Sequence, residues 1–244
     1  TISENGTING SGLFSLAYDG KTVDNIKLVT FRDINEKNLI QLAYNQKMNI
    51  VPDADNFQKM TRLLDYYFDQ GWAAGSALGT LRFEMLRSAG YFYSVYMVRN
   101  ELDSIRLQKI LDSLRWFTLF GETYINSSKE GETADKIRTL ALPKLLYALM
   151  LPDENECTTA MYALQNYLNN ALKTTSGFWG TFKPDGSGYH HYGPYFSAYY
   201  PDALYASCFL FYLLKDTPFA LNDEVYDNLK KALLSFRFLC GEYN

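Results

Sequence analysis

The chain contains little cysteine, no long apolar run and no leader-like start. Its three cysteines, Cys157, Cys208 and Cys240, are far apart, which matches neither a zinc knuckle nor a dense disulfide scaffold. We expect them to be buried free thiols. No apolar stretch approaches the roughly 20 residues that cross a bilayer, so no membrane span is predicted. The first residues lack a basic start followed by an apolar stretch, so we expect a mature or excised chain without a signal peptide.

Positive charge is also in short supply. Lys and Arg total 23 against 27 Asp and Glu, which gives a net charge of −4. A nucleic-acid-binding surface needs a concentrated excess of Lys and Arg, so no nucleic-acid partner is predicted. If the partner is a polyanion, its cations must be gathered locally.

Aromatic residues, in contrast, are abundant. The 244 residues are 47% hydrophobic, which is enough for one large core or two modest ones. Phe, Trp and Tyr make up 16% of the chain, and 20 residues are tyrosine. Aromatic rings stack on the apolar faces of sugars, which favours a carbohydrate-binding groove, but an aromatic-rich core explains the same composition. Composition alone leaves both interpretations open.

Helical periodicity begins at Pro52. Residues 1–51 carry Gly and Asn clusters around short apolar stretches, so an irregular N-terminal segment leading into the helical domain is predicted there. From residue 52 onward, apolar side chains recur at spacings of three and four, and Asp153, Asn222 and Asp223 stand where N-caps or pre-helix turns are expected. The predicted helices cover residues 57–68, 78–102, 104–120, 134–151, 158–172, 202–214 and 223–239.

The connections between most of these helices are short, which predicts antiparallel neighbours. Successive pairs without a heptad pattern indicate an all-α toroid or solenoid of α-hairpins, and no sequence repeat identifies a repeat family.

Residues 176–200 form the one long connection. They include five glycines and two prolines and show neither a helical nor a strand period. A loop of this length inside a compact domain is usually functional or disordered, and disordered segments are poor in the aromatic residues that crowd this one. The sequence therefore predicts an ordered, packed and functional loop.

Both histidines of the chain, His190 and His191, lie side by side in this loop. Histidine exchanges protons near neutral pH, and a tyrosine beside a cation can act as a base and then as an acid. Asp185 precedes a glycine, as is typical of a turn. Adjacent histidines point apart in an extended chain, and no further ligand stands at a suitable spacing, so a metal site through Asp185 and the histidines is not predicted.

Five motifs resemble segments of the chondroitin sulfate ABC lyases, in the same order, within the wider family of chondroitin AC, hyaluronate and xanthan lyases. They are FDQGWAAGSALGT at 68–80, LPDE at 151–154, DGSGYHHYGPYFSAYYPDALYA at 185–206, LLKDTPF at 213–219 and NLKKALLSF at 228–236. The resemblance covers residue 52 to the C-terminus and is less clear over residues 1–51.

This resemblance implies a fold, a reaction and a partner. The fold is all-α, an incomplete (α/α) toroid of antiparallel helix pairs over residues 52–244. The reaction is β-elimination at a uronic acid: the C5 proton is removed, the C4 oxygen leaves and a 4,5-unsaturated product forms. The partner is an anionic polysaccharide, namely chondroitin sulfate, dermatan sulfate and, as a further candidate, hyaluronan. No cofactor is implied, a calcium or magnesium requirement is left open, and a secreted or periplasmic bacterial enzyme is expected.

The resemblance also implies catalytic residues. The family histidine falls on His191 and the family tyrosine on Tyr199, with Tyr200 as the alternative if a one-residue insertion lies elsewhere in the loop. Tyr199 would take the C5 proton and protonate the leaving oxygen for glucuronate. His191 would assist, or act as base from the opposite face for iduronate. The family's Arg and Glu lie farther downstream than this chain extends, so we expect it to carry only part of the catalytic set.

Further residues are implied to contact substrate. His190 stands where a cation usually precedes the catalytic histidine. Arg138 stands where the family often has an Asn that binds the uronate carboxylate, and it is either a bidentate carboxylate ligand or a solvated helix residue. The candidates for sugar stacking are Trp179, Trp72 and Tyr195, and those for sulfate binding are Arg82 and Arg87.

Two other functions remain open. A glycoside hydrolase on an α-toroid needs two carboxylates roughly 5 to 10 Å apart, and the loop offers only Asp185 and Asp202. A non-catalytic carbohydrate-binding module would keep the aromatic residues without the chemistry. Absorbance from an unsaturated uronate would distinguish a lyase from both.

Overall fold

The computed structural model describes residues 22–23, 26–27, 34–48, 54–69, 71–76 and 88–239. The chain divides into two compact units, Thr1–Phe117 and Thr118–Asn244, and each is described separately. Most of the described residues are helical. None of the helices in these ranges combines the length and the apolar character that crossing a membrane would require.

The described part of the first unit starts with a short antiparallel strand pair and continues with helices. Its elements are β1 (Thr22–Val23), β2 (Ile26–Lys27), the π-helix η1 (Ile34–Leu39), α2 (Ile40–Met48), α3 (Ala54–Asp69), α5 (Ala89–Val98) and α6 (Ser104–Phe117). The prediction that residues 1–51 are irregular is wrong for η1 and α2. Asn and Gln interrupt the apolar period there, yet Leu39 and Ala43 are fully buried, so packing stabilises a helix with a weak sequence signal.

An aromatic cluster forms the core of this unit. Trp72 is fully buried, with ring centroids 4.3 Å from Phe117 and 5.0 Å from Tyr91. Tyr67 packs on Tyr91 from the apolar face of α3. The aromatic-rich core that composition left open is therefore present here. Of the helix predicted over residues 78–102, the part up to residue 87 lies outside the described residues.

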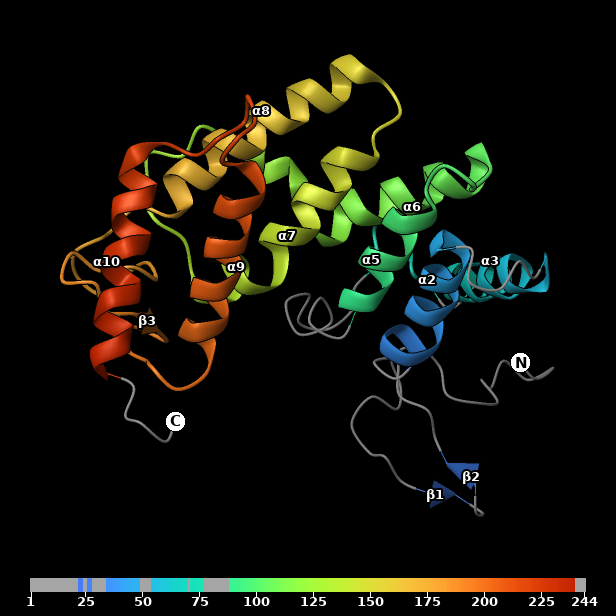
Figure 1. Cartoon of the computed structure of the whole chain (residues 1–244), viewed down its shortest axis with the longest axis horizontal. Helices are drawn as coiled ribbons and strands as arrows, with labels where there is room; N and C mark the ends of the chain where they lie inside the picture. The colour runs from blue at the N-terminus through green and yellow to red at the C-terminus, as the bar shows by residue number, and fades with distance from the viewer. Residues whose placement is uncertain are drawn as a thin grey trace. The chain divides into compact units, whose positions relative to one another are not determined.

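The second unit is built around α7 (Ala134–Met150). This helix packs against α8 (Glu154–Ala171) and α9 (Tyr199–Leu214), and α9 packs against α10 (Asp223–Leu239), its neighbour in Figure 1. Two predicted N-caps are confirmed. The backbone N–H of Glu156 donates to Oδ1 of Asp153 at 2.8 Å, and that of Val225 donates to Oδ1 of Asn222 at 3.0 Å.

The start of this unit departs from the predicted helix over residues 104–120. Helix α6 ends at Phe117, Leu119 is left-handed with φ 55°, and a 3-10 helix, η2 (Phe120–Tyr124), follows. Cys157 and Cys208 are free, as expected, but half-buried where full burial was expected. Cys240 lies outside the described residues.

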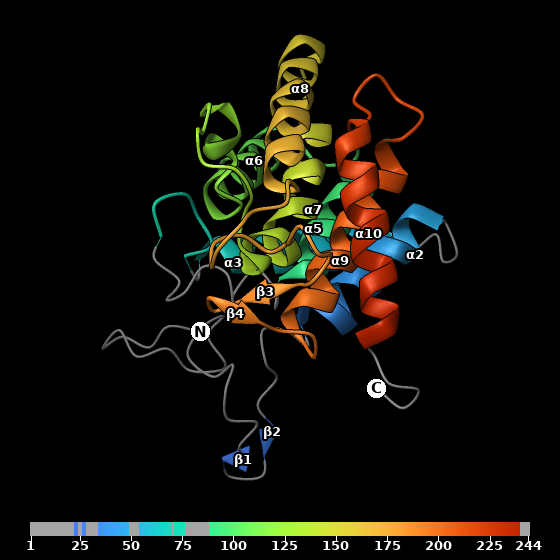
Figure 2. The ribbon, with the colours of Figure 1, turned by 90° about the vertical axis from the view of Figure 1, so that its left-hand side faces the viewer.

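The long loop is ordered, and part of it forms regular structure. It contains a hairpin of β3 (Tyr189–His190) and β4 (Gly193–Pro194), which lies next to the start of α9 (Figure 2). The strands are too short to give an alternating sequence pattern, which is why none was detected. Helix α9 begins at Tyr199, three residues before the predicted start at 202.

A charged residue is buried in α7. Lys144 is fully buried, and its Nζ donates to the carbonyl oxygen of Leu119 at 2.6 Å. Desolvation lowers the pKa of this amine to about 7; Glu122 and Glu132 oppose the shift, and Lys136 adds to it. The unfolded chain has the ordinary value of 10.5 at this position. Between these values the unfolded state binds more protons than the folded state, so the free energy of unfolding rises with pH.

We therefore expect Lys144→Met to remove this rise. Urea unfolding of the original chain and the variant, across a window from about pH 7 to about pH 10, measures the difference between their free energies of unfolding. The free energy of unfolding of the original chain minus that of the variant should increase with pH. Groups that titrate in the same way in both proteins cancel from this difference. A difference that is flat or moves the other way would contradict the burial argument.

A second prediction concerns the contact between the loop and α9. A Cβ placed on Gly188 would lie 2.1 Å from the ring of the buried Tyr200, so Gly188→Ala should lower the free energy of unfolding by about 1 to 3 kcal/mol. Gly193→Ala, in the same hairpin, is the matched control because nothing lies within 4 Å of its added methyl. Thermal melting checks both; equal loss in the two variants would count against the contact.

Candidate active site

The hairpin turn displays the predicted catalytic histidine. His190 pairs with Gly193, so His191 and Tyr192 form a two-residue turn, with φ 51° and 62°. These angles are those of a type I′ turn, which usually carries Asn-Gly, and two bulky residues with positive φ cost about 1 to 3 kcal/mol each. Both side chains are exposed, Tyr192 by 72%. The fold therefore maintains a strained turn that presents His191 to solvent.

Four rings gather around this turn. The His190 centroid lies 3.8 Å from that of His191, 4.3 Å from that of Tyr199 and 5.5 Å from that of Tyr195. The Tyr199 ring is 6.0 Å from the His191 ring, nearly perpendicular to it, and 5.3 Å from the Tyr195 ring. His191 and Tyr199, eight residues apart in sequence, are thus brought together with the buried His190 packed against both.

Arg138 supplies a cation to this ring cluster from α7. Its Cζ lies 4.2 Å from the centre of the Tyr199 ring, and its guanidinium donates to Asp135 Oδ1 at 2.9 and 3.1 Å. Asp202, on α9, approaches the same guanidinium at 3.7 Å. Because only 4% of the Arg138 side chain is exposed, the interpretation of Arg138 as a solvated helix residue is wrong.

Tyr200 faces a different way from Tyr199. It is fully buried, its hydroxyl donates to the carbonyl oxygen of Gly186 at 3.2 Å, and burial raises its pKa. Consecutive residues at the start of a helix point in directions about 100° apart, so only one of the pair can face the hairpin. This burial contradicts Tyr200 as the alternative base.

A buried lysine fixes the first half of the loop. Lys183 Nζ donates to the carbonyl oxygens of Gly177, at 3.0 Å, and Trp179, and it lies 4.4 Å from the centre of the Tyr189 ring. Burial lowers the pKa of Lys183. The amine therefore connects the segment that carries Trp179 to the strand that carries His190.

The other predicted contacts are placed elsewhere. Trp179 lines a cavity of about 670 Å³ whose lining includes neither histidine of the hairpin nor Tyr199. The prediction of Trp72 as a stacking residue is wrong, because its ring is buried in the core of the first unit. Arg82 and Arg87 lie outside the described residues. Asp185 occupies the predicted turn, where its Oδ1 accepts from the backbone N–H of Ser187 at 2.9 Å.

Two residues of the site were missed by the sequence reasoning. Asp135 precedes Arg138 by three positions on the same helix, a spacing that could have indicated the ion pair. Lys183 had no comparable signal, because its partners are backbone carbonyls. Among the described residues, no three His, Cys, Asp or Glu side chains gather closely enough to hold a metal ion.

The chain is similar to known proteins along most of its length. A family model described as "Lyase, catalytic" matches residues 15–244. The chain is 25% identical over 207 residues to the chondroitin sulfate ABC exolyase of Bacteroides thetaiotaomicron, covering 84% of this chain and 20% of that protein. It is 29% identical over 200 residues to the chondroitin sulfate ABC endolyase of Proteus vulgaris, covering 80% and 20%. It therefore spans about a fifth of the length of these curated relatives.

A solved structure shares the fold. The structure of Paenibacillus xanthan lyase matches with a TM-score of 0.64 at 12% identity, over 91% of this chain and 21% of that one. This likeness confirms the predicted fold class, an all-α incomplete (α/α) toroid of antiparallel helix pairs. The matched relatives also confirm the resemblance inferred from the motifs.

The strained turn gives a stability prediction. Glycine adopts positive φ freely, so Tyr192→Gly should be more stable than Tyr192→Ala by about 1 kcal/mol, although both remove the same exposed ring. Urea unfolding of the two variants measures how much the positive φ at residue 192 contributes to the difference between their free energies of unfolding. Equal stability, or a more stable Ala variant, would show that residue 192 does not hold a left-handed conformation in solution.

Proposed function

We propose, because the chain belongs to the family of lyase catalytic domains, that it is the helical catalytic part of a polysaccharide lyase that cleaves chondroitin- and dermatan-type glycosaminoglycans. The observation that carries the proposal is the convergence of His191 and Tyr199 beside the guanidinium of Arg138. Such a cluster offers two proton-transfer groups and a cation, the components that β-elimination at a uronate requires.

In the proposed reaction, the Tyr199 phenolate oxygen removes the proton from C5 of the uronate. The electron pair of the C5–H bond forms the C4–C5 double bond, and the bond from C4 to the glycosidic oxygen breaks. The phenol proton then passes to the leaving oxygen. Arg138 supports this role, because its cation borders the ring that carries negative charge while the phenol is deprotonated.

His191 would serve as the second proton-transfer group. Its exposed position on the turn and its perpendicular approach to Tyr199 suit contact with the other face of the sugar. We propose that it assists with glucuronate and is the base for iduronate, whose C5 proton lies on the opposite face. His190, buried behind it, is then a positioning residue, and Tyr195 forms the aromatic wall next to it.

Charge on the uronate carboxylate must also be stabilised during proton removal. Arg138 is already engaged by Asp135, so it is at most a partial partner for this group. The Arg and Glu implied by the resemblance would complete the set from sequence downstream of this chain. We therefore expect full activity from a longer protein that contains this chain, secreted or periplasmic, acting on chondroitin sulfate and dermatan sulfate, with hyaluronan as a further candidate.

The hydrolase alternative receives less support from the geometry. Asp185 is occupied in its turn, and Asp202 is exposed and faces Arg138. The two carboxylates hold separate structural roles and do not form an acid–base pair. A non-catalytic binding module remains the second candidate, since the aromatic surfaces would serve it equally.

The test follows ultraviolet absorbance of the unsaturated uronate with chondroitin, dermatan and hyaluronan as substrates, using this chain and a longer protein that contains it. Tyr199→Phe should reduce turnover by about 10² to 10⁴-fold, because it removes a positioned proton-transfer group. Tyr200→Phe is the matched control and should retain activity, since that hydroxyl is buried against Gly186. Full activity of Tyr199→Phe would refute the assignment.

His191→Ala should abolish cleavage of dermatan and impair cleavage of chondroitin less. Unimpaired turnover of dermatan would contradict the role of His191. New reducing ends without the absorbance would indicate a hydrolase, and binding without either product would indicate a module.

A further inference from the structure

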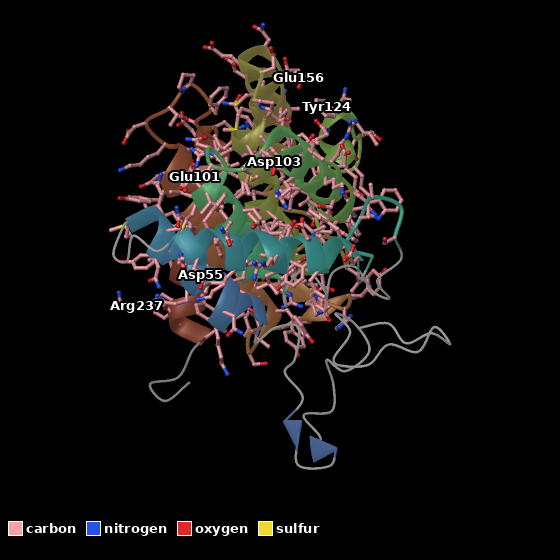
Figure 3. The ribbon with its side chains drawn as sticks, turned by 90° about the vertical axis from the view of Figure 1, so that its right-hand side faces the viewer. Asp55, Glu101, Asp103, Tyr124, Glu156 and Arg237 are labelled. Atoms are coloured by element: carbon pink, nitrogen blue, oxygen red, sulfur yellow. The ribbon has the colours of Figure 1, made fainter. Side chains whose placement is uncertain are left out.

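A second candidate site lies in the same unit, apart from the ring cluster. It is the cavity of about 670 Å³ noted above, within the roughly 300 to 1,000 Å³ typical of small-molecule sites. Its lining comes from η2, from the segment before α7, from Lys136 in the first turn of α7, from α8 and from Trp179 of the long loop. Figure 3 labels Tyr124 on η2 and Glu156 near the start of α8.

The aromatic wall of the cavity is held rigidly. Trp179 Nε1–H donates to the carbonyl oxygen of Glu130 at 2.9 Å, and the Trp179 carbonyl accepts from Thr175 and Lys183. A Cβ on Gly180, which has φ 81°, would lie 2.3 Å from Thr175 Oγ1, so the backbone next to the tryptophan is closely packed. Tyr124, 51% exposed, adds a second aromatic ring to the lining.

The floor of the cavity carries two carboxylates and one ammonium. Lys136 Nζ lies 2.9 Å from Glu122 Oε2 and 3.5 Å from Glu132 Oε2. Two carboxylates thus share one ammonium, which leaves the floor with an excess of negative charge. An anionic sugar would be repelled there, whereas an uncharged ring would meet acceptors for its hydroxyl groups. Amide donors and acceptors are added by Asn126, Asn166 and Asn170.

The remaining cation of the lining covers the tryptophan. Lys129 Nζ lies 3.2 Å from the centre of the Trp179 ring, and the Lys129 side chain is exposed. A cation over an exposed ring is held by about 0.5 to 1 kcal/mol, so a sugar face can displace it.

We infer that this cavity is a binding site for an uncharged pyranose, and that its ligand is an unsulfated N-acetylhexosamine unit stacked on Trp179. The choice of N-acetylhexosamine rests on the proposed function, because that unit alternates with uronate in glycosaminoglycans. The preference for an uncharged ring rests only on the charges of the floor.

The backbone connects this cavity to the hairpin. The N–H of Thr181 donates to the carbonyl oxygen of Glu132 at 2.9 Å, and the N–H of Tyr189 donates to that of Thr181 at 2.8 Å. The lining residue Glu132 and the strand that precedes His191 are therefore joined through a single residue. A sugar unit bound in the cavity would therefore hold the polysaccharide at a fixed point relative to the proton-transfer cluster.

The test uses the indole N–H signals of the whole chain, which has three tryptophans, in ¹H–¹⁵N correlation spectra. Trp179→Phe identifies the signal of Trp179. Titration with methyl N-acetyl-β-D-galactosaminide should move that signal saturably, and methyl β-D-glucuronide should not. Trp179→Ala, followed through the methyl signals of the glycoside by saturation transfer, should weaken binding about threefold to tenfold. Trp116→Phe, in the other unit, is the matched control and should leave binding unchanged.

Lys129→Ala sharpens the test, because Lys129→Ala and Trp179→Ala should change the affinity for the galactosaminide in opposite directions. Uncovering the ring should strengthen binding of the galactosaminide about twofold to fivefold. Weaker binding in this variant, or equal binding of the glucuronide, would overturn the preference for an uncharged ring. No movement of the Trp179 signal up to the solubility limit would overturn the site itself.

The outcomes for the two proposals are separable. Tyr199→Phe should leave binding of the galactosaminide unchanged, because Tyr199 does not line the cavity. Galactosaminide binding, together with no lyase activity in the longer protein that contains this chain, would support the cavity and refute the proposed function. Lyase activity without galactosaminide binding would do the reverse.

Discussion

The amine of Lys183, almost completely buried, donates to the carbonyl oxygens of Gly177 and Trp179 and faces the ring of Tyr189. One ammonium therefore joins two carbonyl groups in the first half of the loop to the strand that begins at Tyr189, and Thr175 also donates to the Trp179 carbonyl. Both surfaces of interest depend on this constraint, since Trp179 forms a wall of the cavity and Tyr189 begins the hairpin that displays His191.

The ring cluster depends in addition on the register of two helices. Arg138 extends from α7 and Tyr199 from the first turn of α9, and these helices pack directly against each other. Asp135 holds the guanidinium, so the cation is oriented before any ligand arrives. The strained turn at His191 and Tyr192 adds to this arrangement, because two residues with positive φ persist only where the surrounding contacts require them.

Much of this could be predicted from the chain alone. The period of apolar residues located the helices of the second unit, the cap residues Asp153 and Asn222 were correct, and the length and aromatic content of residues 176–200 indicated an ordered functional loop. The wrong predictions have physical causes. Helix α2 has too little apolar period to be recognised, and Trp72 was assigned to a surface because a sequence does not distinguish an aromatic core from an aromatic groove.

The sequence by itself determined the fold class, the position of the loop and the candidate residues for proton transfer, because local periodicity, residue type and the motifs shared with the lyases are sufficient for these. Only the tertiary structure showed that Tyr199 faces the hairpin and Tyr200 is buried, since adjacent residues at a helix start differ only in the direction they face. It also separated Trp179 from the histidines, which lie in the same loop but on different surfaces. Side-chain direction is fixed by packing between segments distant in sequence, and that information exists only after the chain has folded.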